Sequence, residues 1–147
     1  GHRLLIESMI KENKNVLIVI GSIQESRTNK NPFTYQERKK MLEICFNNSI
    51  HILGLEDIGS ATKKQWADYV IKEVRSKGLN PVLYYAGDDE DASWFNMRLN
   101  VKKIDRVTKG WGFSGTTLRE KLRNNEDVSD IIANEKILEF IKDIKWV

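Results

Sequence analysis

Hydrophobic and polar positions follow two periods along the chain, and together these predict alternating helices and strands. Apolar side chains recur three and four residues apart where a helix would bury one face, and run continuously or alternate where a strand is expected. Helices are expected over residues 2–13, 34–47, 62–77, 91–98, 114–124 and 127–145. Strands are expected over residues 16–20, 49–55, 81–86 and 101–107.

The order of these elements predicts the fold class. Residues 16–20 are apolar throughout, as in a parallel strand that is buried on both faces. Strands separated by helices of this length imply an α/β fold with a doubly wound parallel sheet, in three layers α/β/α. Residues 1–147 contain no repeat or linker, so we expect one domain. A doubly wound sheet normally begins with a strand, and we expect one to precede Gly1.

Composition narrows the possible functions. The chain has 147 residues, 40% of them hydrophobic, with 24 Lys+Arg against 21 Asp+Glu and a net charge of +3. Basic and acidic residues interleave, so we expect no nucleic-acid partner. No apolar run approaches the ~20 residues of a membrane span. A single cysteine, Cys45, and two histidines argue against a disulfide framework and a resident metal site, and favour a reduced, cytoplasmic setting.

Two predicted helix starts carry an arginine in their first turns. Ser114, Gly115 and Thr116 open one helix and Arg119 follows, so hydroxyl and free N–H groups would face an anion there. An ordinary N-cap beside a surface arginine would give the same pattern.

The other arginine-bearing start is the segment Asn31-Pro32-Phe33-Thr34, followed by Glu37 and Arg38. Thr34 and Glu37 form a capping-box signature. A cation at a helix N-terminus is unfavourable, which a bound anion would explain; pairing of Arg38 with Glu37 or another acid would explain it equally.

The carboxyl ends of parallel strands share one edge of a sheet, where ligands bind. Gly21-Ser22, Gly87-Asp88 and the loop before Ser114 should fall at this edge. Asp88 could face a ribose hydroxyl or a Mg²⁺–phosphate, whereas Asp89 to Asp91 fit a solvated loop better.

Three further side chains are candidates for ligand contact. Trp66 and Trp111 could stack on a flat ring, although Trp66 also fits a core position. His2 stands at the first helix start, where an imidazole can bind a phosphoryl oxygen, unless Gly1-His2 is a processing remnant.

These motifs together resemble the nucleotidyltransferase superfamily, whose members carry His-x-Gly-His and a later Ser-x-Thr-x-x-Arg. Gly1-His2 is similar to the second half of the first motif, and Ser114-Gly115-Thr116 with Arg119 is similar to the second. The stretch from Gly21 to Thr28, with Asn31–Thr34 and Glu37-Arg38, resembles the archaeal-type nicotinamide-nucleotide adenylyltransferases most closely.

The resemblance implies a Rossmann-like nucleotidyltransferase fold and adenylyl transfer from ATP, carried with Mg²⁺, to nicotinamide mononucleotide. It implies four groups of residues: catalytic His2 and Arg119; Ser114, Thr116 and Arg119 on the ATP phosphates; Gly87 and Asp88 near the adenosine; and Arg38, Trp66, Gly21 and Ser22 on the mononucleotide. A homo-oligomer without membrane attachment is expected. Other cytidylyl- or adenylyltransferases of the superfamily, and a non-catalytic nucleotide-binding module, remain as alternatives.

Overall fold

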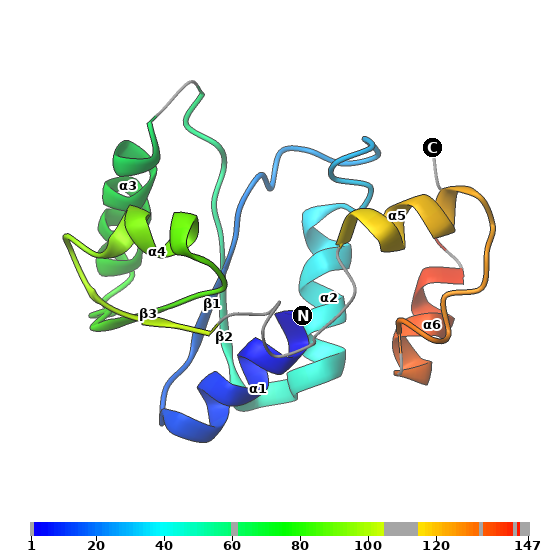
Figure 1. Cartoon of the computed structure of the whole chain (residues 1–147), viewed down its shortest axis with the longest axis horizontal. Helices are drawn as coiled ribbons and strands as arrows, with labels where there is room; N and C mark the ends of the chain where they lie inside the picture. The colour runs from blue at the N-terminus through cyan, green and yellow to red at the C-terminus, as the bar shows by residue number, and fades with distance from the viewer. Residues whose placement is uncertain (1, 60–61, 105–114, 133, 143, 145–147) are drawn as a thin grey trace. The chain divides into compact units, whose positions relative to one another are not determined.

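The computed structural model of the chain describes residues 2–59, 62–104, 115–132, 134–142 and 144 (Figure 1). Its elements are, in order, α1 (His2–Glu12), β1 (Leu17–Ile20), α2 (Tyr35–Phe46), a 3₁₀ turn η1 (Asn47–Ser49), β2 (His51–Gly54), α3 (Lys63–Ser76), β3 (Leu83–Ala86), α4 (Asp89–Phe95), β4 (Asn100–Lys103), α5 (Gly115–Arg123) and α6 (Glu135–Lys142). The order of helices and strands is the predicted one.

The chain forms two compact units, each made of two separate stretches. The first unit combines Gly1–Asn13 with Ile58–Gly112, and the second combines Lys14–Asp57 with Phe113–Val147. Neither unit is therefore a continuous segment of the sequence. Whether residues 1–147 act as one domain stays a prediction.

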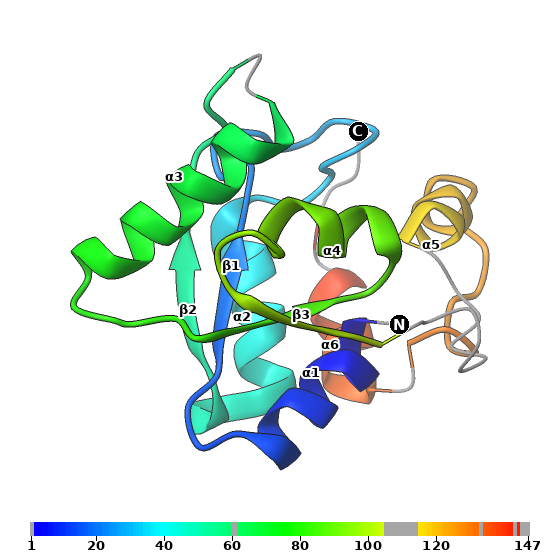
Figure 2. The same ribbon diagram turned by 60° about the vertical axis from the view of Figure 1, so that its left-hand side comes forward.

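The second unit contains the parallel pair β1–β2, with Leu17 opposite His51 and Ile20 opposite Gly54 (Figure 2). Helix α2 connects the two strands and packs against β1. Gly54 allows a close approach, because a Cβ atom there would lie 2.6 Å from the ring of Tyr35. The first residue of α2 therefore rests on the last residue of β2.

Strand β1 is less buried than its apolar sequence predicts. Only Ile20 is fully buried, while Leu17, Ile18 and Val19 are half-buried. Among the described residues β1 has a single strand partner, β2, which leaves its other edge unpaired. An edge strand exposes more of its side chains than a central one.

The core of the second unit lies between α2 and the C-terminal segment. Its buried residues are Val128, Ile137, Ile141 and Ile144, against which Phe33, Met41, Ile44, Cys45, Leu118, Leu122, Ile132, Leu138 and Phe140 pack. The helix expected over 127–145 is wrong in its first part, because α6 begins only at Glu135. Asn134 causes this start: its Oδ1 accepts from the N–H groups of Lys136 (3.0 Å) and Ile137 (3.3 Å) as an N-cap.

The first unit contains the parallel pair β3–β4, with Leu83 opposite Asn100 and Ala86 opposite Lys103. Helix α4 connects these strands and begins at Asp89, two residues before the predicted start. Helix α3 buries one face, formed by Ala67, Val70, Ile71 and Val74. The predicted strand 101–107 is found at Asn100–Lys103, and residues 105–107 lie outside the described residues.

Within the described ranges, no helix is both long and apolar enough to cross a membrane. The same part of the chain holds no group of three or more His, Cys, Asp or Glu side chains that could bind a metal ion.

Candidate functional site

Arg38 lies one turn into α2, and its guanidinium group binds the loop that follows β1. Its Nη1 donates to the carbonyl oxygen of Gly21 at 2.8 Å, and its Nη2 to those of Ser22 at 2.9 Å and Glu25 at 3.4 Å. Its Nε donates to the carbonyl oxygen of Thr34 at 3.4 Å. Four carbonyl oxygens thus face a group that has five N–H donors.

The carboxylate of Asp57 is close to Arg38 but is bound by other side chains. It accepts hydrogen bonds from Ser22 Oγ at 2.9 Å and Gln24 Nε2 at 3.0 Å. Ser22 holds this position with a φ of +50°, a left-handed conformation that is uncommon for a residue with a side chain. Such backbone strain is typical of functional loops.

A second nearby carboxylate, that of Glu25, accepts a hydrogen bond from Asn31 Nδ2 at 2.5 Å. Arg38 therefore forms no ion pair with any described residue. Partial burial lowers the pKa of the Arg38 guanidinium, and the charges of Asp57 and Glu25 oppose this shift. An arginine remains protonated at neutral pH in spite of such a shift. The result is a half-buried positive charge whose direct partners are backbone carbonyls.

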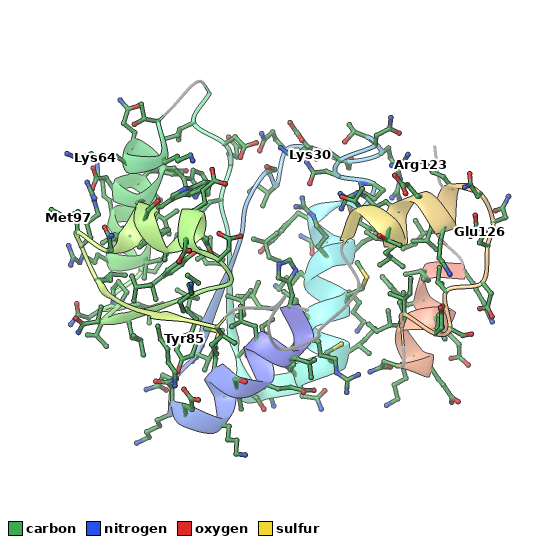
Figure 3. All side chains as sticks on the ribbon, in the orientation of Figure 1. Lys30, Lys64, Tyr85, Met97, Arg123 and Glu126 are labelled. Atoms are coloured by element: carbon green, nitrogen blue, oxygen red, sulfur yellow. The ribbon has the colours of Figure 1, made fainter. Side chains whose placement is uncertain are left out.

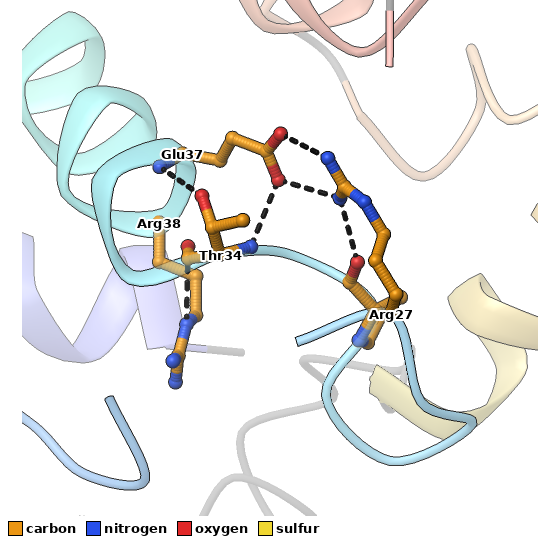
Figure 4. A network of polar contacts seen from close by, with 5 residues as sticks. Arg27, Thr34, Glu37 and Arg38 are labelled. Atoms are coloured by element: carbon orange, nitrogen blue, oxygen red, sulfur yellow. Dashed lines mark hydrogen bonds and ion pairs between the residues drawn. The ribbon is translucent and has the colours of Figure 1, made fainter. Parts of the chain in front are cut away.

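Glu37 pairs with Arg27, so the expectation that Arg38 could pair with Glu37 is wrong. Arg27 Nη1 and Nη2 lie 2.7 and 2.5 Å from the two oxygens of Glu37, as Figure 4 shows. The Thr34 Oγ1 atom accepts from Glu37 N, and Glu37 Oε2 accepts from Thr34 N, which confirms the capping box. The hydrogen bonds that Arg27 donates to Glu37 lower the pKa of the Glu37 carboxyl group.

Helix α5 carries the second arginine-bearing start. Arg119 Nη2 donates to Thr116 Oγ1 at 3.2 Å, and both side chains stand in the first two turns of the helix. Ser114, the predicted cap, lies outside the described residues. The hydroxyl and the guanidinium are thus neighbours, as binding of one phosphate would require.

The predicted adenosine-side residues Gly87 and Asp88 begin α4 in the first unit. Asp88 is the N-cap, because its Oδ1 accepts from Asp91 N at 2.8 Å. Gly87 is buried, and its N–H donates to Asp91 Oδ2 at 3.3 Å. Asp91 also accepts from Tyr84 Oη at 2.7 Å. Burial, and then this hydrogen bond, raises the pKa of Tyr84.

The solvated loop expected at Asp89 to Asp91 is instead the first turn of α4. Acidic side chains stabilise the N-terminal end of a helix dipole, which explains this run of acids without a ligand. Asp89 also pairs with Lys103 at 2.7 Å.

Of the three remaining candidates, His2 and Trp66 are on helices of the first unit, and Trp111 lies outside the described residues. His2 is the first residue of α1 and is exposed. Trp66 is half-buried in the first turn of α3, with its ring 5.7 Å from that of Tyr69. Trp66 is not among the buried residues of α3, and both its core position and its stacking on a ring stay predictions.

The structure therefore brings Gly21, Ser22 and Arg38 into one cluster, and Thr116 and Arg119 into another, within the second unit. Sequence reasoning missed Asp57 and Gln24, which complete the first cluster. Asp57 lies 33 positions from Gln24, and no local motif marks a contact across that separation.

Parallel strand pairs joined by helices, with polar loops at strand ends, define a protein of the α/β class. Residues 1–121 match the model of the Cytidylyltransferase-like family, and the chain belongs to this family. It is 29% identical over 154 residues to a nicotinamide-nucleotide adenylyltransferase of Pyrococcus horikoshii, covering all of this chain and 78% of that protein. It is 27% identical over 160 residues to the protein of the same name from Archaeoglobus fulgidus, covering all of this chain and 86% of that protein.

A solved structure gives the same fold. The chain is similar to a bifunctional NMN adenylyltransferase/ADP ribose pyrophosphatase from Francisella tularensis, with a TM-score of 0.74 and 21% identity. The match covers 97% of this chain and 45% of that protein, so this chain spans less than half of its length. The predicted Rossmann-like nucleotidyltransferase fold is confirmed.

Proposed function

We propose that this protein transfers the adenylyl group of ATP to nicotinamide mononucleotide, giving NAD and pyrophosphate. The observation that carries the proposal is Arg38: a half-buried guanidinium on the loop after β1, with no carboxylate bound to it. Membership of the Cytidylyltransferase-like family, and similarity over the whole of this chain to proteins named nicotinamide-nucleotide adenylyltransferase, support the same reaction.

In this reaction a 5′-phosphate oxygen of the mononucleotide attacks the α-phosphorus of ATP in line. One P–O bond forms there, the bond to the β-phosphate bridging oxygen breaks, and pyrophosphate leaves with Mg²⁺. The protein has to hold two polyanions in line and neutralise charge at the reacting phosphorus and the leaving group. Arginines and helix starts provide both effects.

The residues take roles that fit their chemistry. Arg38 holds the mononucleotide phosphate beside Gly21 and Ser22, while Thr116, Arg119 and Ser114 hold the β- and γ-phosphates of ATP. The remaining roles follow the resemblance: His2 stabilises the α-phosphate region, Trp66 stacks on the nicotinamide ring, and Gly87 with Asp88 lies near the adenosine. Mg²⁺ arrives as part of the ATP complex and is substrate rather than resident cofactor.

The test is formation of NAD and pyrophosphate from ATP, Mg²⁺ and nicotinamide mononucleotide. Arg119→Ala should lower kcat/KM by about 100-fold or more, as loss of a transition-state charge donor does. Arg123→Ala, on the same helix (Figure 3), is the matched control. Among the described residues, Arg123 Nη2 donates only to the carbonyl oxygen of Asn29, at 3.2 Å. Equal rates for the two variants would contradict the assignment of Arg119.

The family to which the chain belongs favours a second candidate, a cytidylyltransferase. CTP in place of ATP, with glycerol phosphate, FMN or pantetheine phosphate as acceptor, tests it in the same pyrophosphate assay. Turnover with CTP and an acceptor, but not with ATP, would contradict the proposed adenylyl transfer and support cytidylyl transfer. Binding of ATP without turnover of any acceptor would indicate a nucleotide-binding module.

A further inference from the structure

A pocket of about 590 Å³ opens in the second unit, away from the Arg38 cluster. It is lined by residues of α2, η1, β2 and α6: Lys39, Lys40, Glu43, Ile44, Asn47, Asn48, Ile50, His51, Ile52 and Lys136. None of these residues belongs to the proposed reaction site.

The pocket runs along α2 from Lys39 and Lys40, which follow Arg38, to the opposite end of the strands. Arg38 contacts Gly21, the residue directly after the last residue of β1. The pocket instead takes in His51, the first residue of β2, together with Asn47 and Asn48, which follow the last residue of α2. Because β1 and β2 are parallel, these are the amino ends of both strands. A ligand here would not overlap with one held at the carboxyl ends.

Positive charge dominates the lining. Three lysines face one carboxylate, that of Glu43, whose oxygen lies 3.9 Å from Lys39 Nζ. Lys40 and Lys136 form no ion pair with another described residue, and Lys136 is the second residue of α6, where the helix dipole disfavours a cation. Like charges gathered without compensation cost stability, and a bound anion would offset this cost.

The rest of the lining is suited to an organic body attached to the anion. Ile50 is buried and Ile44 and Ile52 are half-buried, so they add a small apolar area to a mostly polar pocket. The side-chain amides of Asn47 and Asn48 are exposed and hydrogen-bond to no other described residue. Asn47 has a φ of +48° and a ψ of −127°, a strained conformation that holds it at the end of α2.

We propose that this pocket binds a small organic phosphate of nucleotide size. Its volume falls in the range of small-molecule sites, about 300–1,000 Å³. Lysine ammonium groups bind phosphate as point charges, the isoleucines accept an apolar ring face, and the asparagines bind polar ring atoms. The proposal does not depend on the adenylyl-transfer reaction, since no residue is shared.

The test measures protection of individual lysines in the full chain. The protein is acetylated with a limiting amine reagent with and without AMP, and modification of Lys40 and Lys136 is quantified by mass spectrometry. Inorganic pyrophosphate serves as a probe with charge but no organic body. Lys64, an exposed lysine on α3 without an ion pair to a described residue, reports unspecific protection in the same sample (Figure 3).

AMP should protect Lys40 and Lys136 by several-fold and leave Lys64 unchanged. In each of the single variants Lys40→Gln and Lys136→Gln, the AMP concentration that half-protects the other lysine should rise about tenfold. Lys64→Gln should have no effect. Arg119→Ala should also leave this protection intact, whereas it impairs the proposed reaction, so the two proposals fail separately.

Three results would overturn the proposal. Protection by pyrophosphate equal to that by AMP would show an unselective cationic surface. Uniform protection of Lys40, Lys136 and Lys64 would show the same. A lack of protection of Lys40 and Lys136 in the wild type at millimolar AMP would show that the pocket binds no such ligand. For the variants, an unchanged Tm shows that they are folded.

Discussion

Replacement of Glu37 by Gln tests the network that fixes the start of α2. Glu37 accepts from Arg27 Nη1 and Nη2 at 2.7 and 2.5 Å, and from Thr34 N at 2.8 Å. Glutamine keeps one acceptor oxygen, which in the place of Oε2 still accepts from Thr34 N and Arg27 Nη1, but it loses the charge and the hydrogen bond from Arg27 Nη2. The bidentate ion pair is removed while the size of the side chain is retained.

The exposure of the Arg27–Glu37 pair sets how much unfolding free energy the substitution removes. The side chains of Arg27 and Glu37 are 33% and 19% exposed, so water screens their attraction only in part. Exposed ion pairs contribute up to about 1 kcal/mol, and hydrogen bonds to charged groups about 1.5–3 kcal/mol. We therefore expect Glu37→Gln to lower the free energy of unfolding by about 1–2 kcal/mol. For a chain of this size, Tm should fall by roughly 3–6 °C.

The effect should depend on pH. Arg27 lowers the pKa of Glu37 below its ordinary value of 4.5, so the folded state favours the carboxylate. Its contribution to stability is present above pH 4.5 and is lost as the pH falls through the lowered pKa of the folded state. The difference between the wild type and Glu37→Gln should therefore close in acid, below pH 4.5.

Thermal and urea unfolding, followed by circular dichroism at pH 7 and pH 3, measure both effects. Glu43→Gln is the control on the same helix: its partner Lys39 is 3.9 Å away, and the two side chains are 43% and 39% exposed. This variant should change stability by less than about 0.5 kcal/mol. Equal losses for the two variants, or a pH-independent difference for Glu37→Gln, would refute the reasoning.

Three further changes test other parts of the structure. Tyr85→Phe should cost about 1 kcal/mol in urea unfolding, because it removes the hydroxyl that donates to Glu12 at 2.6 Å; no loss would show that water replaces this contact. Asn134→Ala should destabilise α6 by about 1 kcal/mol, and Asn134→Gly by less, as seen in Tm; the reverse order would contradict the cap. Arg38→Lys should raise KM for nicotinamide mononucleotide about tenfold or more with ATP saturation unchanged, because lysine lacks the planar fork; an unchanged KM would remove Arg38 from the site.

Most helices and strands could be predicted because their signals are local. Thr34 and Glu37 form the predicted capping box, and the apolar run before Gly21 contains β1. The errors also have local causes. Asn134 caps α6 and so starts it at Glu135, inside the helix predicted over 127–145, and Asp88 caps α4 and so starts it at Asp89.

The partner of each charged side chain could not be predicted, because it depends on contacts between distant segments. The sequence marked Arg38 as unusual but left its partner open between a phosphate, Glu37 and another acid. In the structure Glu37 pairs with Arg27, ten positions away, and Asp57 accepts a hydrogen bond from Gln24. Choosing among several acids near one arginine requires the loop conformation, which neighbouring residue types do not determine.

Arg27 and Arg38 bind different parts of the loop between β1 and α2, and the proposed function would affect the two parts differently. Arg27 fastens residues 27–34 to α2 through the carboxylate of Glu37 and the carbonyl oxygen of Pro32, at 2.9 Å. Arg38 holds residues 21–25 mainly through neutral carbonyls, which a doubly charged phosphate outcompetes. An incoming mononucleotide would therefore exchange partners only with the first part of the loop. The helix start would stay anchored throughout, so each catalytic cycle would begin from the same rigid base.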